Sequence, residues 1–334
     1  MSHVVRDPYS FQILEPGATH SADGRKLPEN WAEGVAHCVA MAGARSSGKS
    51  LYIAVLVKQL ELLANEHDRS VLPVDQSTAD RYHDNYEVPL FEEMKHMDTT
   101  PSGANLDAYQ SDPFIFSLGE WLDPEGVLRT NYLVIRDVAG EDLENLQTDT
   151  SYLNFFQHAD LVVFLFDPLR VPSVSNFLHG FITDEAATGG DPETVFANLM
   201  TLLGPARPKL AIAVSKFDTL QKLEELDQGD WKLIMGNVGA AFRRDTGIGF
   251  DWTDAFVLNQ EVRSLLQYIK ADNLYHQIIS QYREAEPDSY HFFAVSALGE
   301  STQGERVSRL GIAPYRVLDP IRWLLSPRYV FPSQ

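Results

Sequence analysis

Cysteine is almost missing from this sequence, because Cys38 is the only one in 334 residues. A single thiol forms no intramolecular disulfide and builds no cysteine-based zinc cage, so both kinds of cross-link are excluded. Cys38 stands in an apolar stretch, where we expect a small buried side chain. The fold must therefore rest on an ordinary hydrophobic core, and 44% hydrophobic residues in a chain of this length can supply one.

Long apolar runs are missing as well. No segment approaches the roughly 20 apolar residues that a membrane-spanning helix needs, so we expect no membrane insertion. The opening residues, MSHVVRDPYS, have neither the basic flank nor the apolar run of a signal peptide. The sequence therefore predicts a soluble, cytoplasmic protein.

Basic residues are scarce, since 27 Lys and Arg stand against 47 Asp and Glu, a formal net charge of -20. Such a surface repels nucleic acid and anionic membranes at long range, so we expect neither as a partner. Acidity does not exclude a bound nucleotide, because a local nest of backbone N–H groups holds phosphate whatever the total charge.

Apolar segments alternate with helical patterns along the chain, which indicates an α/β fold with a mainly parallel sheet. We expect an N-terminal extension over 1–35, a main domain over 36–326 and a tail over 327–334. Within the main domain, the polar stretch 66–112 is interpreted as a long switch-like loop, and 219–289 as a helical insert.

Two of the expected strands, PFIFSLG at 113–119 and TNYLVIRDVAG at 130–140, flank a turn of Asp, Pro, Glu and Gly. That turn chemistry is typical of an antiparallel hairpin. The other strands are joined by helices and should be parallel, with their carboxyl ends at one edge of the sheet. Ligands of α/β proteins bind at that edge.

The phosphate-binding pattern G-x-x-x-x-G-K-[ST] is matched in full by Gly43, Ala44, Arg45, Ser46, Ser47, Gly48, Lys49 and Ser50. The glycines permit the tight turn that aims backbone N–H groups at phosphate oxygens, and we extend the expected cradle to Leu51. Lys49 would reach the β- and γ-phosphates of a nucleotide, and the Ser50 hydroxyl would bind Mg²⁺.

Two further strand ends bear on the nucleotide. Asp137 and Gly140 form D-x-x-G, in which the carboxylate can hold Mg²⁺ and the Gly N–H can meet the γ-phosphate. Ser215, Lys216 and Asp218 follow another strand. The Asp218 carboxylate can accept two hydrogen bonds that guanine offers and adenine lacks, while the Lys216 stem can cover the ring.

The last predicted strand ends in Ser296, Ala297 and Leu298, whose backbone N–H groups could meet the guanine carbonyl. In order and spacing, the four motifs resemble Ras-like P-loop GTPases of the translation-factor-related class. The segments DVAGED, ADLVVFLFDP and RVLDPIRWLL are similar, more narrowly, to the bacterial double-GTPase group.

This resemblance implies a three-layer fold whose six-stranded sheet is mostly parallel, with one antiparallel edge hairpin. It also implies GTP or GDP and Mg²⁺ as ligands, a nucleotide-dependent switch, and an effector or regulatory protein as partner.

Three positions depart from the pattern of this family. Ser215 replaces the usual Asn and offers fewer hydrogen bonds, which should weaken guanine affinity. Glu141 replaces the Gln that orients water, so we expect slow unassisted hydrolysis. Arg45 replaces a Gly. It either points to solvent or pairs with a nearby acid, or else it leans over the phosphates and neutralises their charge during catalysis.

The first switch should contribute a Thr to Mg²⁺ from within 66–112. We choose Thr100, beside Thr99, with Thr78 as the weaker candidate. Two other functions stay open: a scaffold that never turns its nucleotide over, and a P-loop ATPase or kinase, which Asp218 argues against.

Overall fold

The computed structural model describes residues 4–94, 112–178, 190–225, 230–283, 285, 288–299 and 311–332. In these ranges one mixed sheet contains seven strands in the order β2-β3-β4-β1-β5-β6-β7. Its strands are β1 Val35–Gly43, β2 Leu72–Pro73, β3 Phe114–Leu122, β4 Leu128–Arg136, β5 Leu161–Phe166, β6 Lys209–Val214 and β7 Tyr290–Ala294.

The pairing of the strands confirms a mostly parallel sheet with an antiparallel edge. β1 pairs in parallel with β4 and β5, and β6 pairs in parallel with β5 and β7. The predicted hairpin is β3 and β4. The expected count of six strands is wrong by one, because Leu72 and Pro73 pair with β3 as a further antiparallel strand. Two residues are too few to show the alternation that marks a strand in sequence.

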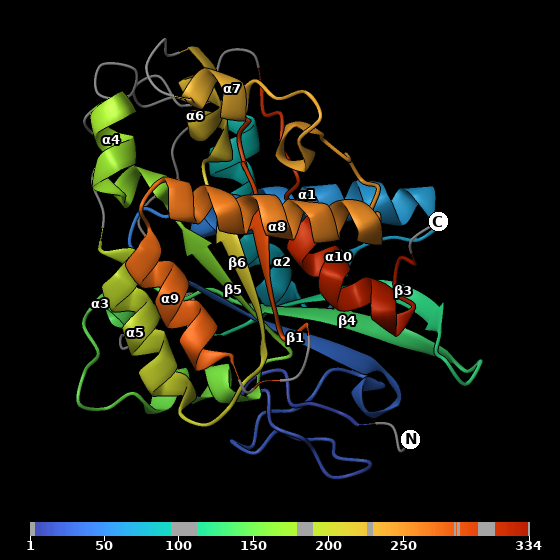
Figure 1. Cartoon of the computed structure of the whole chain (residues 1–334). Helices are drawn as coiled ribbons and strands as arrows, with labels where there is room; N and C mark the ends of the chain where they lie inside the picture. Colours follow the sequence, from blue (N-terminus) through green and yellow to red (C-terminus); the bar gives the residue numbers. More distant parts are fainter. Residues whose placement is uncertain are drawn as a thin grey trace.

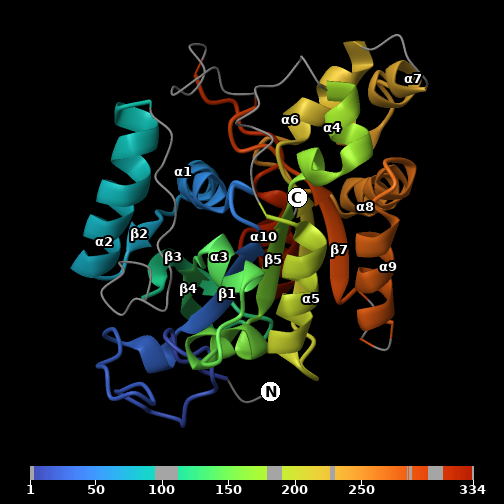
Figure 2. The same cartoon turned by 90° about the vertical axis from the view of Figure 1, so that its left-hand side faces the viewer.

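Helices cover the sheet on both faces, and Figure 2 shows α3 and α5 on the near face and α10 on the far one. Because it is covered on both sides, β5 is buried along its whole length. The α-helices are α1 Lys49–Glu66, α2 Gln76–Tyr82, α3 Gly140–Glu144, α4 Pro172–Leu178, α5 Pro192–Leu203, α6 Phe217–Gln221, α7 Trp231–Met235, α8 Trp252–Tyr268, α9 Asp272–Gln281 and α10 Asp319–Leu325.

Shorter helical turns complete the described chain. The 3₁₀ helices are η1 Trp31–Glu33, η3 Ser151–His158, η4 Pro168–Arg170, η6 Lys222–Glu225, η7 Ala241–Arg243 and η8 Ser326–Arg328. A π-helix, η2, spans His83–Glu92. No helix among the described residues is long and apolar enough to cross a membrane.

The expectation of a bare loop after residue 66 is wrong for the part between β2 and the end of η2. Asp75 caps α2 by accepting the Thr78 N–H at 2.6 Å. The buried rings of Tyr82 and Tyr86 lie edge-on to Phe114 of β3. The buried face of this segment consists of Thr78, Tyr82, Tyr86 and Leu90, and the hydroxyl groups of the first three mask its apolar character in the sequence.

The two ends of the chain pack against the sheet. Trp31 stacks on Tyr132 with ring centroids 4.6 Å apart and donates its Nε1–H to Arg6 O at 2.8 Å. In the C-terminal segment, Phe331 packs edge-on against Trp121. Figure 1 shows the N-terminal segment in blue, below the sheet and away from α1. The domain boundaries themselves stay predictions.

Candidate nucleotide-binding site

The glycine-rich loop joins β1 directly to α1, as the sequence predicts. The backbone takes left-handed conformations within it, with φ of 146° at Gly43, 62° at Ser46 and 93° at Gly48. A Cβ at Gly43 would lie 2.7 Å from Leu165 O, so only glycine fits there. The loop opens onto the N-terminus of an 18-residue helix, which is favourable for an anion.

Lys49 lies under this loop and is only 5% exposed. Its ammonium group donates to Gly43 O at 2.8 Å and to Ala44 O at 3.0 Å. Burial lowers the pKa of Lys49 to about 8, against the opposing attraction of Asp137 and Glu144. Neutral carbonyl oxygens of the loop therefore hold the buried ammonium of Lys49. A positive charge held in this way suits the loop to receive a phosphate.

Asp137 follows β4 and faces the start of α1. Its Oδ2 accepts the hydroxyl of Ser50 at 3.1 Å and that of Tyr86 at 2.9 Å. Its Oδ1 is buried and has no hydrogen-bond partner in the described part of the chain, and the same is true of Ser47 Oγ. Burial raises the pKa of Asp137, although Lys49 counteracts this effect. The unsatisfied oxygens fit a site that takes Mg²⁺ and phosphate groups.

The helix after Asp137, α3, lies directly against the phosphate loop. A Cβ on Gly140 would lie 2.2 Å from Arg45 N. The Arg45 N–H donates to Glu144 Oε1 at 2.6 Å, and the Arg45 guanidinium pairs with Glu141 Oε1 at 2.9 Å. The contact with Glu141 is the pairing with an acid that one of the interpretations of Arg45 expects, while its role toward phosphate stays a prediction. Both of those side chains are about half exposed, so the pair adds little stability.

The predicted base-reading residues lie at the ends of β6 and β7. Asp218 is buried and its Oδ1 accepts the Ser296 hydroxyl at 2.6 Å. Lys216 has a left-handed backbone, with φ 50°, and its ammonium pairs with Asp167 at 2.7 Å. The Ser215 hydroxyl donates to Phe166 O at 3.2 Å. The structure thus brings the third and fourth motifs into contact.

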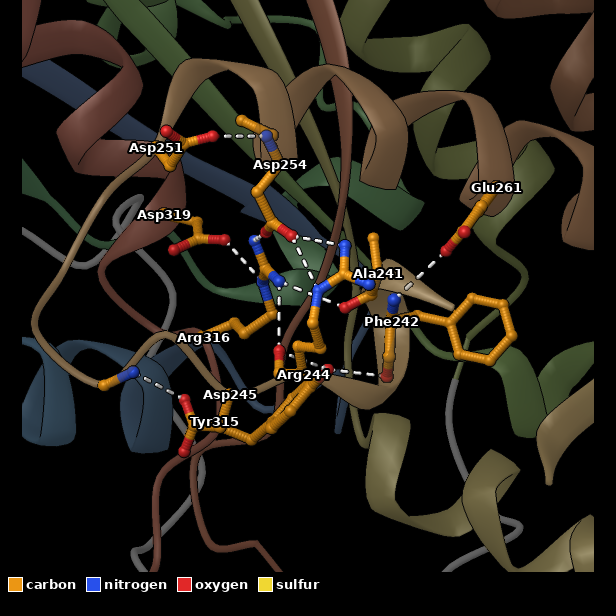
Figure 3. A network of polar contacts seen from close by, with 12 residues as sticks. Ala241, Phe242, Arg244, Asp245, Asp251, Asp254, Glu261, Tyr315, Arg316 and Asp319 are labelled. Atoms are coloured by element: carbon orange, nitrogen blue, oxygen red, sulfur yellow. Dashed lines mark hydrogen bonds and ion pairs between the residues drawn. The ribbon is translucent and has the colours of Figure 1, made fainter. Parts of the chain in front are cut away.

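A buried polar network supports this end of the site (Figure 3). Arg316 donates to Asp254 and to Asp319, each at 2.6 Å, and to two backbone carbonyls near η7. The neighbouring Tyr315 exchanges two backbone hydrogen bonds with Ser296. The network ties the insert that carries α8 to the segment beside the predicted base-reading residues.

Several predicted site residues are not placed beside these groups. Thr100 and Thr99 lie outside the described residues. Thr78 is buried in α2, and its hydroxyl accepts the Ile115 N–H, so it serves the contact with β3 and not the loop. Leu298 O accepts the Ala313 N–H at 3.0 Å. The roles of all the site residues toward a ligand stay predictions.

Sequence reasoning missed two residues of the site, Tyr86 and Glu144. Glu144 stands four residues after Gly140, a spacing that places both within one helical turn and could have been noticed. Tyr86 lies in a segment interpreted as a loop, although Tyr82, Tyr86 and Leu90 recur every four residues, a spacing typical of one face of a helix.

Comparison with curated proteins gives a relative in Mycolicibacterium smegmatis, named "Putative ESX-1 scaffolding and assembly protein SaeC". It is 45% identical over 302 residues, which are 90% of this chain and 77% of the relative. No protein-family model matches the chain.

Among solved structures, the chain resembles the bacterial selenocysteine-specific elongation factor EF-Sec with a TM-score of 0.28 and 11% identity, over 79% of this chain and 26% of that one. The GTPase-like domain of Ski7 from S. cerevisiae, bound to GTP, has a TM-score of 0.33 and 12% identity, over 85% of this chain and 48% of that one. The chain thus spans less than half of either structure.

Proposed function

The chain belongs to the family of the Mycolicibacterium smegmatis protein SaeC, and we propose that it is a GTP-binding switch with slow GTP hydrolysis. The observation that carries this proposal is a glycine-rich loop whose carbonyls hold the buried ammonium of Lys49, beside a buried carboxylate, Asp137, that keeps one oxygen unsatisfied. A Ras-like P-loop arrangement of the domain is part of the same proposal.

Each group in the cradle has a defined task in this account. The loop N–H groups and Lys49 hold the phosphates, and the Gly140 N–H meets the terminal one. Ser50 and Asp137 would hold Mg²⁺, which neutralises charge on the β- and γ-phosphates. Loss of the terminal phosphate changes the position of α3 and so an interaction surface.

Slow hydrolysis follows from the contact between Arg45 and Glu141. A carboxylate that pairs with this guanidinium is not positioned to orient water, and its charge repels the terminal phosphate.

The name of the relative contains the words scaffolding and assembly. It supports a second candidate function, a scaffold that keeps its nucleotide intact. Phosphate release from a single turnover separates the two, because the switch releases phosphate slowly and the scaffold releases none.

Calorimetric titration with GTP, GDP and ATP in the presence of Mg²⁺ tests the proposal. We expect GTP and GDP to bind at least about 100-fold more tightly than ATP, because the Asp218 carboxylate matches two donors of guanine and faces an acceptor on adenine. Equal affinities for GTP and ATP would support the ATPase or kinase alternative. Absence of binding by all three nucleotides would contradict any nucleotide function.

Glu144 should oppose nucleotide binding, because its carboxylate already accepts an N–H of the phosphate loop and brings a negative charge close to Lys49. The variant Glu144→Gln removes the charge and keeps the shape and the acceptor. We expect the affinity for GTP to rise about tenfold, which corresponds to about 1.4 kcal/mol. Calorimetry measures the change.

The matched control is Glu66→Gln, which makes the same charge change at the exposed far end of α1. Its affinity should equal that of the native protein. An unchanged or weaker affinity of Glu144→Gln would show that α3 does not compete with phosphate.

A further inference from the structure

Tyr86 is a fully buried residue of the π-helix η2, and it approaches the candidate metal site from outside the known motifs. Its ring is fixed by an edge-on contact with Phe114, with centroids 5.0 Å apart, and by a stacked contact with Tyr82. Its hydroxyl donates to Asp137 Oδ2 at 2.9 Å. π-Helical turns are rare and occur often at functional sites.

The two carboxylate oxygens of Asp137 are used unequally. Oδ2 accepts two hydroxyl donors, from Ser50 and Tyr86, whereas the buried Oδ1 has no partner among the described residues. Two donors on one oxygen fix the rotation of the carboxylate about its Cβ–Cγ bond. Oδ1 is consequently the oxygen left to bind a cation. A carboxylate oxygen is the ligand type that Mg²⁺ prefers.

The segment of α2 and η2 is also fastened to α1, the helix that follows the phosphate loop. The hydroxyl of Tyr82, the last residue of α2, donates to Ala54 O at 2.9 Å, and Lys58 pairs with Glu87 of η2 at 2.5 Å. These contacts lie on either side of Tyr86 in the sequence. The buried hydrogen bond from Tyr86 to Asp137 is the contact through which a shift of Asp137 would reach η2.

We propose that Tyr86 is a positioning residue for a divalent cation. It holds Asp137 so that Oδ1 can bind the cation, and it makes the position of η2 depend on whether a cation occupies that site. The inference rests on the proposed function, since it concerns the Mg²⁺ that accompanies the nucleotide. Tyr86 acts through Asp137 and touches neither phosphate nor cation itself.

The test is the Mg²⁺ dependence of GDP affinity in the variant Tyr86→Phe, which loses the hydroxyl and keeps the ring contacts. Dissociation constants are measured by calorimetry with Mg²⁺ and with EDTA. For the native protein we expect tighter binding with Mg²⁺. For Tyr86→Phe we expect that enhancement to fall about tenfold while the affinity in EDTA is unchanged, which a general loss of structure would not produce.

The control is Tyr82→Phe. This variant loses a neighbouring hydroxyl that donates to a backbone carbonyl, and it should keep the native Mg²⁺ dependence. If native protein and Tyr86→Phe show the same enhancement, the inference is wrong and the proposed function stands. If the native protein binds no nucleotide, both fail together.

A second measurement needs no variant. Amide hydrogen exchange of residues 83–92 in the GDP-bound native protein should change when Mg²⁺ is added, because Tyr86 joins η2 to Asp137. Identical exchange with Mg²⁺ and EDTA would overturn the link even if Tyr86→Phe proved too unstable to study.

Discussion

Replacement of Lys49 by Met should abolish measurable GTP and GDP binding, with a loss of affinity of at least about 100-fold. The ammonium is the only cation that the structure holds beneath the loop among the described residues, and it contacts two loop carbonyls. Hydrogen bonds to a charged group contribute about 1.5–3 kcal/mol each, so the loss of two to phosphate accounts for this effect. Calorimetry with GDP and Mg²⁺ measures it.

The fold should tolerate this change, because Met fills much of the same buried space and the loss of a donor to the two loop carbonyls costs only about 1–3 kcal/mol each. The unfolding midpoint without nucleotide should stay within a few degrees of the native value. Lys26→Met, an exposed change in the N-terminal segment, is the matched control and should bind nucleotide normally. Native affinity in Lys49→Met would place the phosphates outside this loop.

The phosphate loop could be predicted because its contacts are local. Lys49 reaches carbonyl groups only five and six residues away, and the glycines act through their own backbone. The hairpin was equally accessible, since a turn with Asp, Pro and Gly connects its strands directly. Such features depend on short stretches of sequence, which a pattern can describe.

The missed contacts are distant in sequence. Tyr86 lies 51 residues from Asp137, and Arg45 lies 99 residues from Glu144. The contact of Arg45 with Glu144 forms because the sheet brings β1 and β4 side by side, and that of Tyr86 with Asp137 forms because η2 packs on β3 next to β4. No pattern within one segment specifies such a pair, so the way in which α3 and η2 contact the cradle could not be derived from the sequence.

The second large effect concerns the base. Asp218 lies in the first turn of α6, just after β6, and one of its carboxylate oxygens accepts the Ser296 hydroxyl. Asp218→Asn replaces a carboxylate, which accepts from the two donors of guanine, by an amide that brings a donor of its own. Because the amide N–H₂ then opposes the guanine amino group, GTP affinity should fall about 100-fold. The change keeps the size of the side chain.

Xanthine carries a carbonyl oxygen where guanine carries that amino group. An amide at position 218 can donate to this oxygen and accept from the ring N–H, so the variant should gain XTP binding. Lys216 and Ser296 are unchanged in the variant. The matched control is Asp230→Asn, which is an exposed change before α7 and should keep the native preference.

The most direct test of the account is therefore a set of four titrations, GTP and XTP each against the native protein and against Asp218→Asn. We predict that the native protein binds GTP and rejects XTP, and that the variant reverses this order. If the variant binds GTP as tightly as the native protein does, Asp218 does not read a guanine base and the account is contradicted.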